Sequence, residues 1–522
     1  MAAAKPEEEL TSDSEEEEEE DDYVLEEDEE EFEEEEEESV GAGTERFRDQ
    51  RSKLNNLFRR LSSEPVLLRV HDIIIKGNTK TVDSVIESEI RDLKTATSMQ
   101  ELLQAASVAA ARLHRLDIFE TVNVTLDAGP PELPDTANVV IEVVEAKSPI
   151  TGDVGIFTKP EARSWSVEGS LKFKNLFGHG DIWKFSGAYG WDQTGEISTG
   201  LSLPRLKGLW TPVVARIFLL SQDWLKFSSY QERLLGVSVG LLSTQHHDLE
   251  YNLTWRTLTD PSHMASKSIR RQLGYNLLSS LKYTYKVDRR DSQLRPTRGY
   301  AFVSKSQIGG LGPDSKSLKF LRQEFDFRFA IPLGFYRSAL NFGVTAGVAL
   351  PWGKGFMSMP TPLPEQFFIG SHLSPVCSLG GPSTLFGFKC RGLGPSESRR
   401  FLINKAGQDD SAVDPGRDVL GGDLAVTAFA DLSFDLPLKL FREAGIHGHM
   451  FACAGNLAKL SGGEIQNFSL KKFGETFRSS AGCGIVIPTK LFRIEINYCY
   501  ILKQLEHDQG KTGIQFNFSS PF

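Results

Sequence analysis

The chain has 522 residues and a formal net charge of −13, but this charge is concentrated at one end. Residues 1–38 hold 24 acidic residues and one basic residue, so the rest of the chain carries a net charge of +10. Five cysteines, an odd number without C-x-x-C spacing, argue against a disulfide framework and against a zinc site. No apolar stretch reaches the roughly 20 residues of a transmembrane helix, and the acidic N-terminus lacks the features of a cleavable targeting signal.

Residues 1–44 are predicted to form a disordered acidic tail. Uninterrupted glutamate runs leave too few apolar side chains to offset chain entropy. Such runs fit a solubilising role, and they also fit docking of basic partners. Residues 45–64 follow as a basic amphipathic linker, which suits either a membrane surface or packing on the next domain.

Residues 65–147 read as one compact unit in the order β-α-α-β-β. A strand-like run ends at the turn pair Gly77-Asn78, and Thr81 is a candidate cap for the first helix. The second helix is expected over Met99–Arg115. The last two strands are expected over Phe119–Leu126 and Asn138–Val144.

This unit resembles a POTRA domain, the soluble module that precedes the barrel in the BamA-like family of outer-membrane insertases. The resemblance is carried by the turn Gly77-Asn78-Thr79, by the run Leu116-Asp117-Ile118-Phe119 and by the last strand, Val139–Glu145. An exposed edge strand in such a domain can pair with an extended peptide, so it implies a receptor or handover role, with a spacer as the alternative.

Residues 148–522 predict a transmembrane β-barrel of about 16 antiparallel strands. Apolar and polar residues alternate in segment after segment, as in Phe325, Phe327 and Phe329 against Asp326 and Arg328. An even count suits a closed antiparallel barrel, because hydrocarbon satisfies no backbone N–H or C=O group. The strands are expected near residues 152, 164, 181, 196, 211, 232, 248, 273, 298, 317, 336, 423, 445, 477, 491 and 511.

Residues 351–422 interrupt this rhythm with a long loop rich in proline and glycine, and loops of that length are usually functional or disordered. The run Leu385-Phe386-Gly387-Phe388 resembles the family's aliphatic-Arg-Gly-aromatic motif, which lies on a loop folded into the barrel lumen. Phe386 stands where the family pattern has Arg, so a lock onto lumenal carboxylates is either absent or supplied by Lys389 or Arg391.

The C-terminal strand, Lys511–Phe518, fits the sorting signal of mitochondrial barrel proteins. Lys511, Gly513, Phe516 and Phe518 occupy the named positions of that pattern, polar-x-Gly-x-x-hydrophobic-x-hydrophobic. Together with a single POTRA domain, this makes residues 65–522 similar to the core subunits of the mitochondrial sorting and assembly machinery.

The resemblance implies a function without enzyme chemistry, metal or cofactor. It implies that the protein inserts β-barrel precursors into the mitochondrial outer membrane, together with accessory subunits of an assembly complex and without nucleic acid. The barrel would open laterally between the last strand and a first strand that carries Gly152, Gly155 and Phe157. The incoming strand would then find backbone partners inside the bilayer.

Other functions remain open on the sequence alone. A protein-conducting or solute pore of a plastid outer envelope is the alternative of a different class. Gly236-Val237-Ser238-Val239-Gly240 matches a nucleophile elbow but lies within an alternating strand. His447 and His449 share a strand face, but no second pair of metal ligands accompanies them.

Overall fold

The structure is a computed structural model that describes residues 67–519. It leaves out residues 134, 148–149, 160–163, 191–193, 205–210, 243–245, 313–317, 354–358, 371–372, 378, 401–415, 464–465, 467 and 490–492 within that range. The predicted acidic tail (1–44) and basic linker (45–64) lie outside the described residues.

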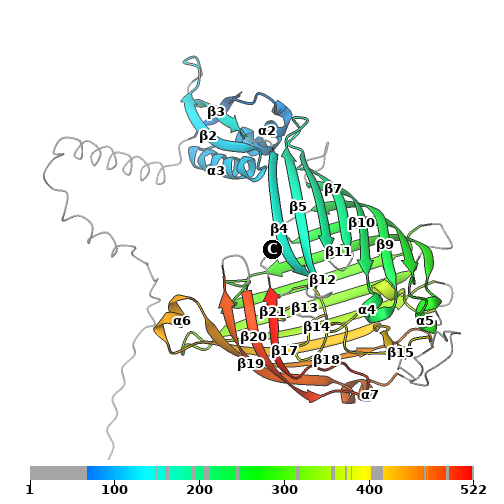
Figure 1. The fold of residues 1–522 in the computed structure, drawn as a ribbon. Helices are drawn as coiled ribbons and strands as arrows, with labels where there is room; N and C mark the ends of the chain where they lie inside the picture. The colour runs from blue at the N-terminus through cyan, green and yellow to red at the C-terminus, as the bar shows by residue number, and fades with distance from the viewer. Residues whose placement is uncertain are drawn as a thin grey trace, which may run out of the picture.

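The N-terminal domain is a three-stranded sheet with two helices, which confirms the predicted order (Figure 1). β3 (Thr136–Glu145) lies in the middle, parallel to β1 (Arg69–Lys76) and antiparallel to β2 (Phe119–Ala128). Helix α2 (Asp83–Glu89), the 3-10 helix η1 (Arg91–Thr95) and helix α3 (Met99–Arg115) connect β1 to β2.

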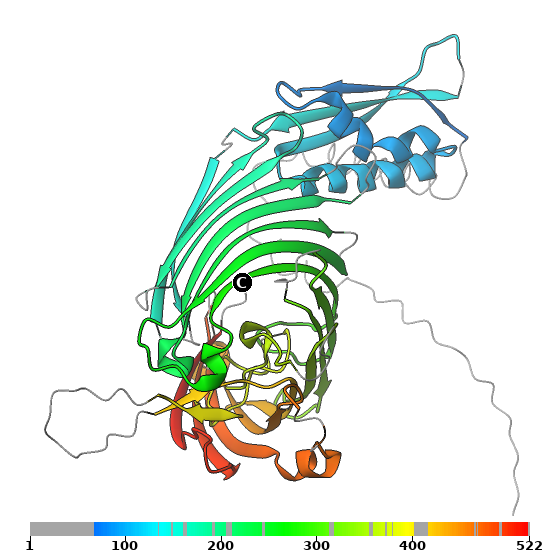
Figure 2. The same cartoon turned by 90° about the vertical axis from the view of Figure 1, so that its right-hand side faces the viewer.

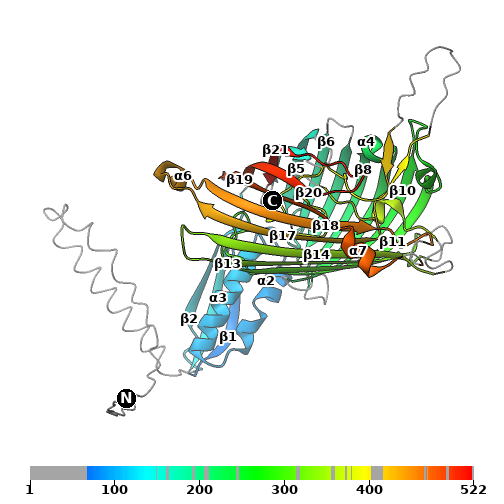
Figure 3. The ribbon, with the colours of Figure 1, turned by 90° about the horizontal axis from the view of Figure 1, so that it is seen from below.

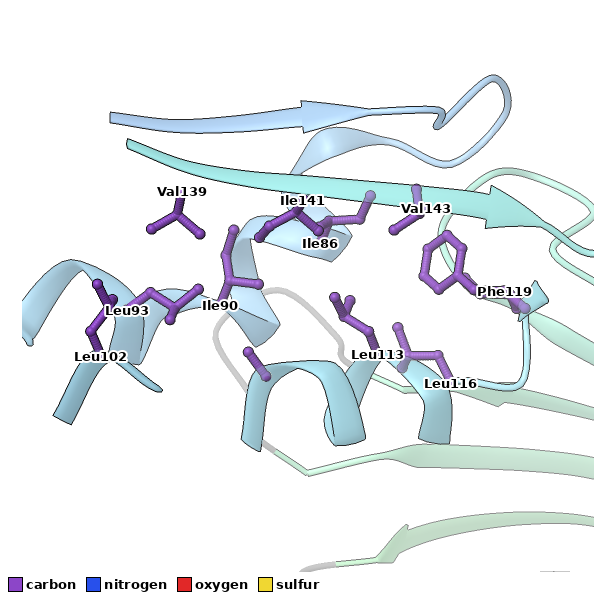
Figure 4. Close-up of a cluster of buried hydrophobic side chains, with 12 residues drawn as sticks. Ile86, Ile90, Leu93, Leu102, Leu113, Leu116, Phe119, Val139, Ile141 and Val143 are labelled. Carbon is purple, nitrogen blue, oxygen red and sulfur yellow. The ribbon is translucent and has the colours of Figure 1, made fainter. Parts of the chain in front are cut away.

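The core of this domain lies between the helices and the sheet, as Figure 4 shows. Ile86 and Ile90 from the first helical segment and Leu113 from α3 meet Val139 and Ile141 of β3, and all five are fully buried. Burying each such side chain contributes about 1.5–3 kcal/mol. This core is large enough to fix the helices on the sheet.

The two helices begin in different ways. Ser98 caps α3, because its hydroxyl accepts a hydrogen bond from the Glu101 backbone N–H (3.2 Å). The predicted cap of α2 is wrong: the helix begins at Asp83, its N-cap residue is Val82, and no side chain caps it. The Thr81 hydroxyl instead donates to the Glu145 carboxylate (2.6 Å).

The C-terminal part is a single antiparallel sheet of sixteen strands that curls round on itself (Figures 1 and 2). All sixteen begin within about three residues of the predicted positions. They are β4 (Ile150–Lys159), β5 (Ser164–Lys174), β6 (Ile182–Gly190), β7 (Gly195–Leu203), β8 (Val213–Asp223), β9 (Gln231–Leu242), β10 (His247–Thr259), β11 (Gly274–Asp288), β12 (Gly299–Gly309), β13 (Phe320–Pro332), β14 (Ala339–Pro351), β17 (Leu424–Asp435), β18 (His447–Ala458), β19 (Arg478–Pro488), β20 (Arg493–Lys503) and β21 (Gly513–Ser519).

The two faces of the sheet have opposite chemistry. On β13, Phe325 and Phe327 are about half exposed on the outside, whereas Asp326 and Arg328 are buried in the interior. The predicted alternation is therefore confirmed, and it is the arrangement of a barrel with lipid outside. No helix in the described ranges is long and apolar enough to cross a membrane.

Connections alternate between two rims of the barrel. Helix α6 (Lys439–Glu443) precedes β18 and helix α7 (Leu470–Glu475) follows it, and Figure 3 shows the two at opposite ends of that strand. The β5–β6 turn lies on the rim beside the POTRA-like domain, and the long connection between β14 and β17 starts from the other rim. We call these the near rim and the far rim.

Candidate gate and lumenal loop

Two strands of the large sheet have a partner on one side only. β4 pairs with β5 from Ile150 through Lys159, and β21 pairs with β20 from Gly513 through Ser519. The strand order runs from β21 to β4, and no pairing joins these two strands among the residues that the structure describes. Their outer edges, here called the last edge and the first edge, therefore face each other as candidate sites for strand addition.

β21 carries three of the four residues of the predicted C-terminal signal. Ile514 and Phe516 point outward and are mostly exposed, while Gln515 and Asn517 are buried inside. Phe518 pairs with Ile494 of β20. The predicted start of this strand is wrong, because it begins at Gly513 and leaves Lys511 in the preceding connection.

Gly513 adopts a φ of 112°, a conformation that side chains with a Cβ rarely adopt. The pattern's glycine therefore stands at the point where the chain turns into β21.

The predicted gate residues all lie on β4. Gly152 pairs with Leu171, Gly155 with Glu168 and Phe157 with Ser166. A Cβ at position 152 would come within 3.0 Å of the Leu171 side chain, so the glycine permits a close approach of β5. Val154 is 84% exposed on the outward face, so the first edge presents apolar groups to lipid.

The long connection folds back into the barrel, as Figure 2 shows for the yellow segments inside the curve of the sheet. Residues 352–423, here called the lumenal loop, contain the 3-10 helix η2 (Leu363–Glu365) and a small hairpin of β15 (Ser396–Ser398) and β16 (Arg417–Val419). The predicted position of the loop in the lumen agrees with this arrangement.

The motif of the lumenal loop lies on an apolar patch of the wall. Leu385, Phe386 and Phe388 are almost completely buried, in a cluster that includes Phe451 and Cys453 of β18 and Cys499 of β20. The Phe386 ring centroid lies 4.5 Å from that of Phe451. The Ser480 hydroxyl donates to the Phe386 carbonyl oxygen (2.6 Å). Phe386 thus occupies an apolar seat in place of an ionic one.

Arg391 does not replace the missing motif arginine as an ion-pair partner. Its guanidinium lies 3.5 Å from the ring centroid of Trp224 and 3.9 Å from that of Phe368. Within the described residues it forms no ion pair with a carboxylate. The arginine therefore joins the loop to the β8–β9 connection through cation–π contacts.

The wall supplies its own cations to the lumenal carboxylates. On β20, Arg493 Nε lies 2.8 Å from Glu495 Oε1, and on β13 Arg328 Nε lies 2.8 Å from Asp326 Oδ1. Because these carboxylates are already paired, the loop needs no arginine at position 386 to balance their charge.

One buried ion network fastens the lumenal loop to the opposite wall. Arg256 of β10 lies 2.9 Å from Glu232 of β9 and 2.9 Å from Glu365 of the loop. All three side chains are less than a tenth exposed. Inward-facing charges on β9 and β10 are visible in the alternation, but no sequence signal assigns Glu365 to them. The sequence alone therefore missed this contact.

The lumenal loop also holds the connection that leads into β21. Lys389 N donates to Gln509 O (3.0 Å), Gln509 N to Gly392 O (2.8 Å) and Lys511 N to Gly387 O (2.7 Å). Phe388 and Gly510 form an isolated antiparallel bridge. Lys511, predicted as part of the signal, thus contacts the loop motif through its backbone.

The other candidate chemistry occupies structural positions. His449 makes 2.7 Å and 2.6 Å contacts to Asp431 Oδ1 and Asn497 Oδ1, so both its ring nitrogens have partners. No group of three or more potential metal ligands occurs within the described residues. Ser238 lies in the middle of β9, far from any strand-to-helix turn.

Family comparisons match both parts of the chain. The model of the Omp85 superfamily domain matches residues 175–522, and the POTRA model, described as surface antigen variable number repeat, matches residues 68–146. BamA from Haemophilus ducreyi lacking POTRA domains 1–3 has the same fold, with a TM-score of 0.68 over 87% of this chain and 84% of that chain at 17% identity.

Curated relatives align over most of their length. The chain is 28% identical over 472 residues to sorting and assembly machinery component 50 homolog B of Xenopus laevis, covering 87% of this chain and 90% of that protein. It is 27% identical to the Homo sapiens homolog, covering 86% and 90%. It is also 27% identical to a SAM50-like protein of Schizosaccharomyces pombe, covering 81% and 83%.

Proposed function

The chain belongs to the Omp85 superfamily, and we propose that it folds β-barrel precursor proteins and inserts them into the mitochondrial outer membrane between β4 and β21. The observation that carries the proposal is the pair of facing edges, each with one hydrogen-bonded neighbour. The similarity to sorting and assembly machinery components supports the same conclusion.

The physical task is to supply backbone partners inside hydrocarbon. An unpaired N–H or C=O group there costs several kcal/mol, so a precursor strand cannot enter the bilayer alone. The first edge offers a row of such groups on β4, and outward apolar side chains such as Val154 keep lipid on that face. When a precursor strand pairs with β4, the backbone N–H and C=O groups along the shared edge of both strands form hydrogen bonds. This pairing needs neither a nucleotide nor enzyme chemistry.

The last edge would separate while the precursor enters, and the lumenal loop keeps its position during that step. The Lys389 N–H, which donates, and the Gly387 and Gly392 carbonyl oxygens, which accept, hold the connection that leads into β21. One face of the incoming strand then contacts the polar interior of the barrel, and its other face contacts the bilayer. Accessory subunits of an assembly complex would act at the rims.

The alternative predicted function, a protein-conducting or solute pore of a plastid outer envelope, receives less support. The lumenal loop places buried apolar clusters and the Arg256 network inside the barrel. A barrel whose interior is occupied by a loop is better suited to pairing strands at its edge than to passing solute or protein through its lumen.

Depletion of the protein followed by a pulse of newly made porin tests the proposal. We expect porin to reach the outer membrane and to remain unassembled there. Normal porin assembly with impaired passage of solute or protein would contradict the insertase function.

Cross-linking locates the site of entry. A cysteine at Val154 on β4 should cross-link to a cysteine in the last strand of an arrested precursor. A cysteine at Ile308 on β12, also outward and partly exposed, is the matched control. Equal cross-linking at both positions would rule out entry at the first edge.

A further inference from the structure

The turn between β5 and β6 (residues 175–181) is fixed by its own hydrogen bonds. Asn175 adopts a left-handed φ of 54°, and its backbone N–H donates to Asp181 O (2.6 Å). Its side-chain oxygen accepts from Gly180 N (3.0 Å), and Asp181 Oδ1 accepts from Phe177 N (3.1 Å). The turn is therefore a rigid surface on the near rim.

The POTRA turn at residues 79–82 docks on this surface. Asn175 Nδ2 donates to Thr81 Oγ1 (2.8 Å), and Val82 N donates to Gly178 O (2.9 Å). Thr81 and Asn175 are only 4% and 6% exposed. A Cβ at Gly178 would lie 2.4 Å from the Lys80 carbonyl oxygen, so the two turns touch through their backbones.

Glu145 holds the same POTRA turn from the other side. Its carboxylate accepts hydrogen bonds from the side chain and backbone of Thr81, from the Thr79 hydroxyl and from Lys80 N. Partial burial raises the pKa of this carboxyl, but the four hydrogen-bond donors outweigh burial and lower the pKa to about 2. Glu145 is therefore ionised throughout the physiological range.

Glu145 and Asn175 occupy matching positions in the chain. Glu145 ends β3, and β4 begins five residues later at Ile150; Asn175 follows the last residue of β5. The near-rim ends of the β4–β5 hairpin are thus attached to one POTRA turn. A salt bridge from Lys174 to Asp117 (2.6 Å) reinforces the contact at the end of β5.

We propose that Glu145 and Asn175 are positioning residues for insertion, because through the POTRA turn at residues 79–82 they hold both near-rim ends of the β4–β5 hairpin. The POTRA domain then sets the position of the first edge. A shift of this domain moves β4 relative to β21. This inference rests on the proposed function, since the position of β4 matters for insertion only if a precursor pairs with it.

The hydrogen bonds that join Glu145 to Asn175 through Thr81 are here called the clamp. A distance measurement in the full-length protein, reconstituted in lipid nanodiscs, tests it. Spin labels at Ser107→Cys on α3 and Glu443→Cys on α6 report the position of the POTRA domain, in a background where the two cysteines that are not buried, Cys377 and Cys483, are replaced. The isosteric variant Thr81→Val removes the hydroxyl that joins Glu145 to Asn175. The matched control is Thr125→Val, on β2 of the same domain and outside the clamp.

Thr81→Val should broaden the distance distribution and slow precursor insertion several-fold while precursor binding stays at the wild-type level. Thr125→Val should change neither. Gly178→Ala, which pushes on Lys80 without touching the POTRA core, provides the second variant and should reproduce both effects.

An unchanged distance distribution in both clamp variants would overturn the proposal. So would a broadened distribution combined with wild-type insertion, because the clamp would then be structural only. A wild-type protein that inserts no precursor would refute the proposed function and the positioning role together. The distances would still decide whether the clamp exists, so the two failures remain distinguishable.

Discussion

The first and last edges of the barrel are secured by different parts of the molecule. On the first edge, the POTRA turn at residues 79–82 holds the β4–β5 hairpin from the near rim, through hydrogen bonds to Glu145 and Asn175. On the last edge, the lumenal loop holds the entry to β21 from inside the far rim, through backbone hydrogen bonds and a buried apolar seat.

Because the two edges are held by different segments, a change in the POTRA turn and a change in the lumenal loop can each act on one edge and leave the other in place. The first edge depends on a few hydrogen bonds, and those to the Glu145 carboxylate are partly open to water although the Asn175–Thr81 bond is buried. Hydrogen bonds of this kind are individually weak. The last edge depends on burial inside the barrel, where lost contacts cost more. We expect the POTRA side to be the easier one to release, and the following changes test that difference.

The largest effect is expected where the lumenal loop meets the wall. Arg256→Ala leaves Glu232 buried without its cation and leaves Glu365 only the longer 3.5 Å pair with Arg322, and breaking a buried pair in this way costs about 3–5 kcal/mol. Thermal unfolding in nanodiscs and protease sensitivity of the loop measure it. Arg216→Ala, which removes a more exposed pair with Glu196, is the control and should cost about 1 kcal/mol or less.

The motif seat comes next. Phe386→Ala should loosen the loop by about 3 kcal/mol, because it leaves a cavity beside Phe451. Phe386→Arg, which restores the family residue, should also be destabilising, since Glu495 already has Arg493. Phe386→Leu should be mild. A stabilising Phe386→Arg variant would show that this apolar site can hold an arginine paired with a lumenal carboxylate.

A smaller effect is expected on the first edge. Gly178→Ala and Gly463→Ala both place a Cβ at positive φ, which costs about 1–2 kcal/mol, but only the former meets a neighbouring backbone atom. Hydrogen exchange at the Val82 amide, which donates to Gly178, reports the junction. Faster exchange in Gly178→Ala alone is expected. Equal exchange in both variants would place the junction elsewhere.

The smallest effect is expected for the pH dependence of the same junction, because Glu145 is only partly buried and solvent screens its contribution. Because the pKa of Glu145 is lowered from 4.5 to about 2, its ionised form stabilises the folded state above pH 4.5, and this contribution is lost as the pH falls from 4.5 toward 2. Distance measurements across that range should show the POTRA domain released in acid. Glu145→Gln should flatten the dependence, and Glu142→Gln, an exposed neighbour on β3, should not.

Most of the fold was predictable because strand periodicity is a local property. All sixteen barrel strands and the outward position of Phe516 follow from alternation that each segment carries by itself, and the two POTRA helices follow from apolar residues at helical spacing. The start of β21 was misplaced because Lys511 continues the alternation, although its N–H is bonded to Gly387 of the loop.

The contacts between segments could not be predicted in the same way. Pairing of Arg256 with Glu365 joins positions that are 109 residues apart, and nothing in either segment specifies the other. Thr81 had the sequence signature of a helix cap, but its hydroxyl serves Glu145 and Asn175 instead. Such long-range hydrogen bonds hold both the first and the last edge in position.

The even number of strands in the barrel constrains the direction of its clients. β4 runs from the near rim to the far rim and β21 runs back, so a precursor strand that pairs antiparallel with β4 has the direction of β21. If that strand is the precursor's last, a client with an even number of strands brings its first strand antiparallel to β21. A client with an odd number, such as a 19-stranded barrel, brings it parallel. Antiparallel and parallel ladders space their hydrogen bonds differently, so parity alone gives the two kinds of client unequal contacts with the last edge.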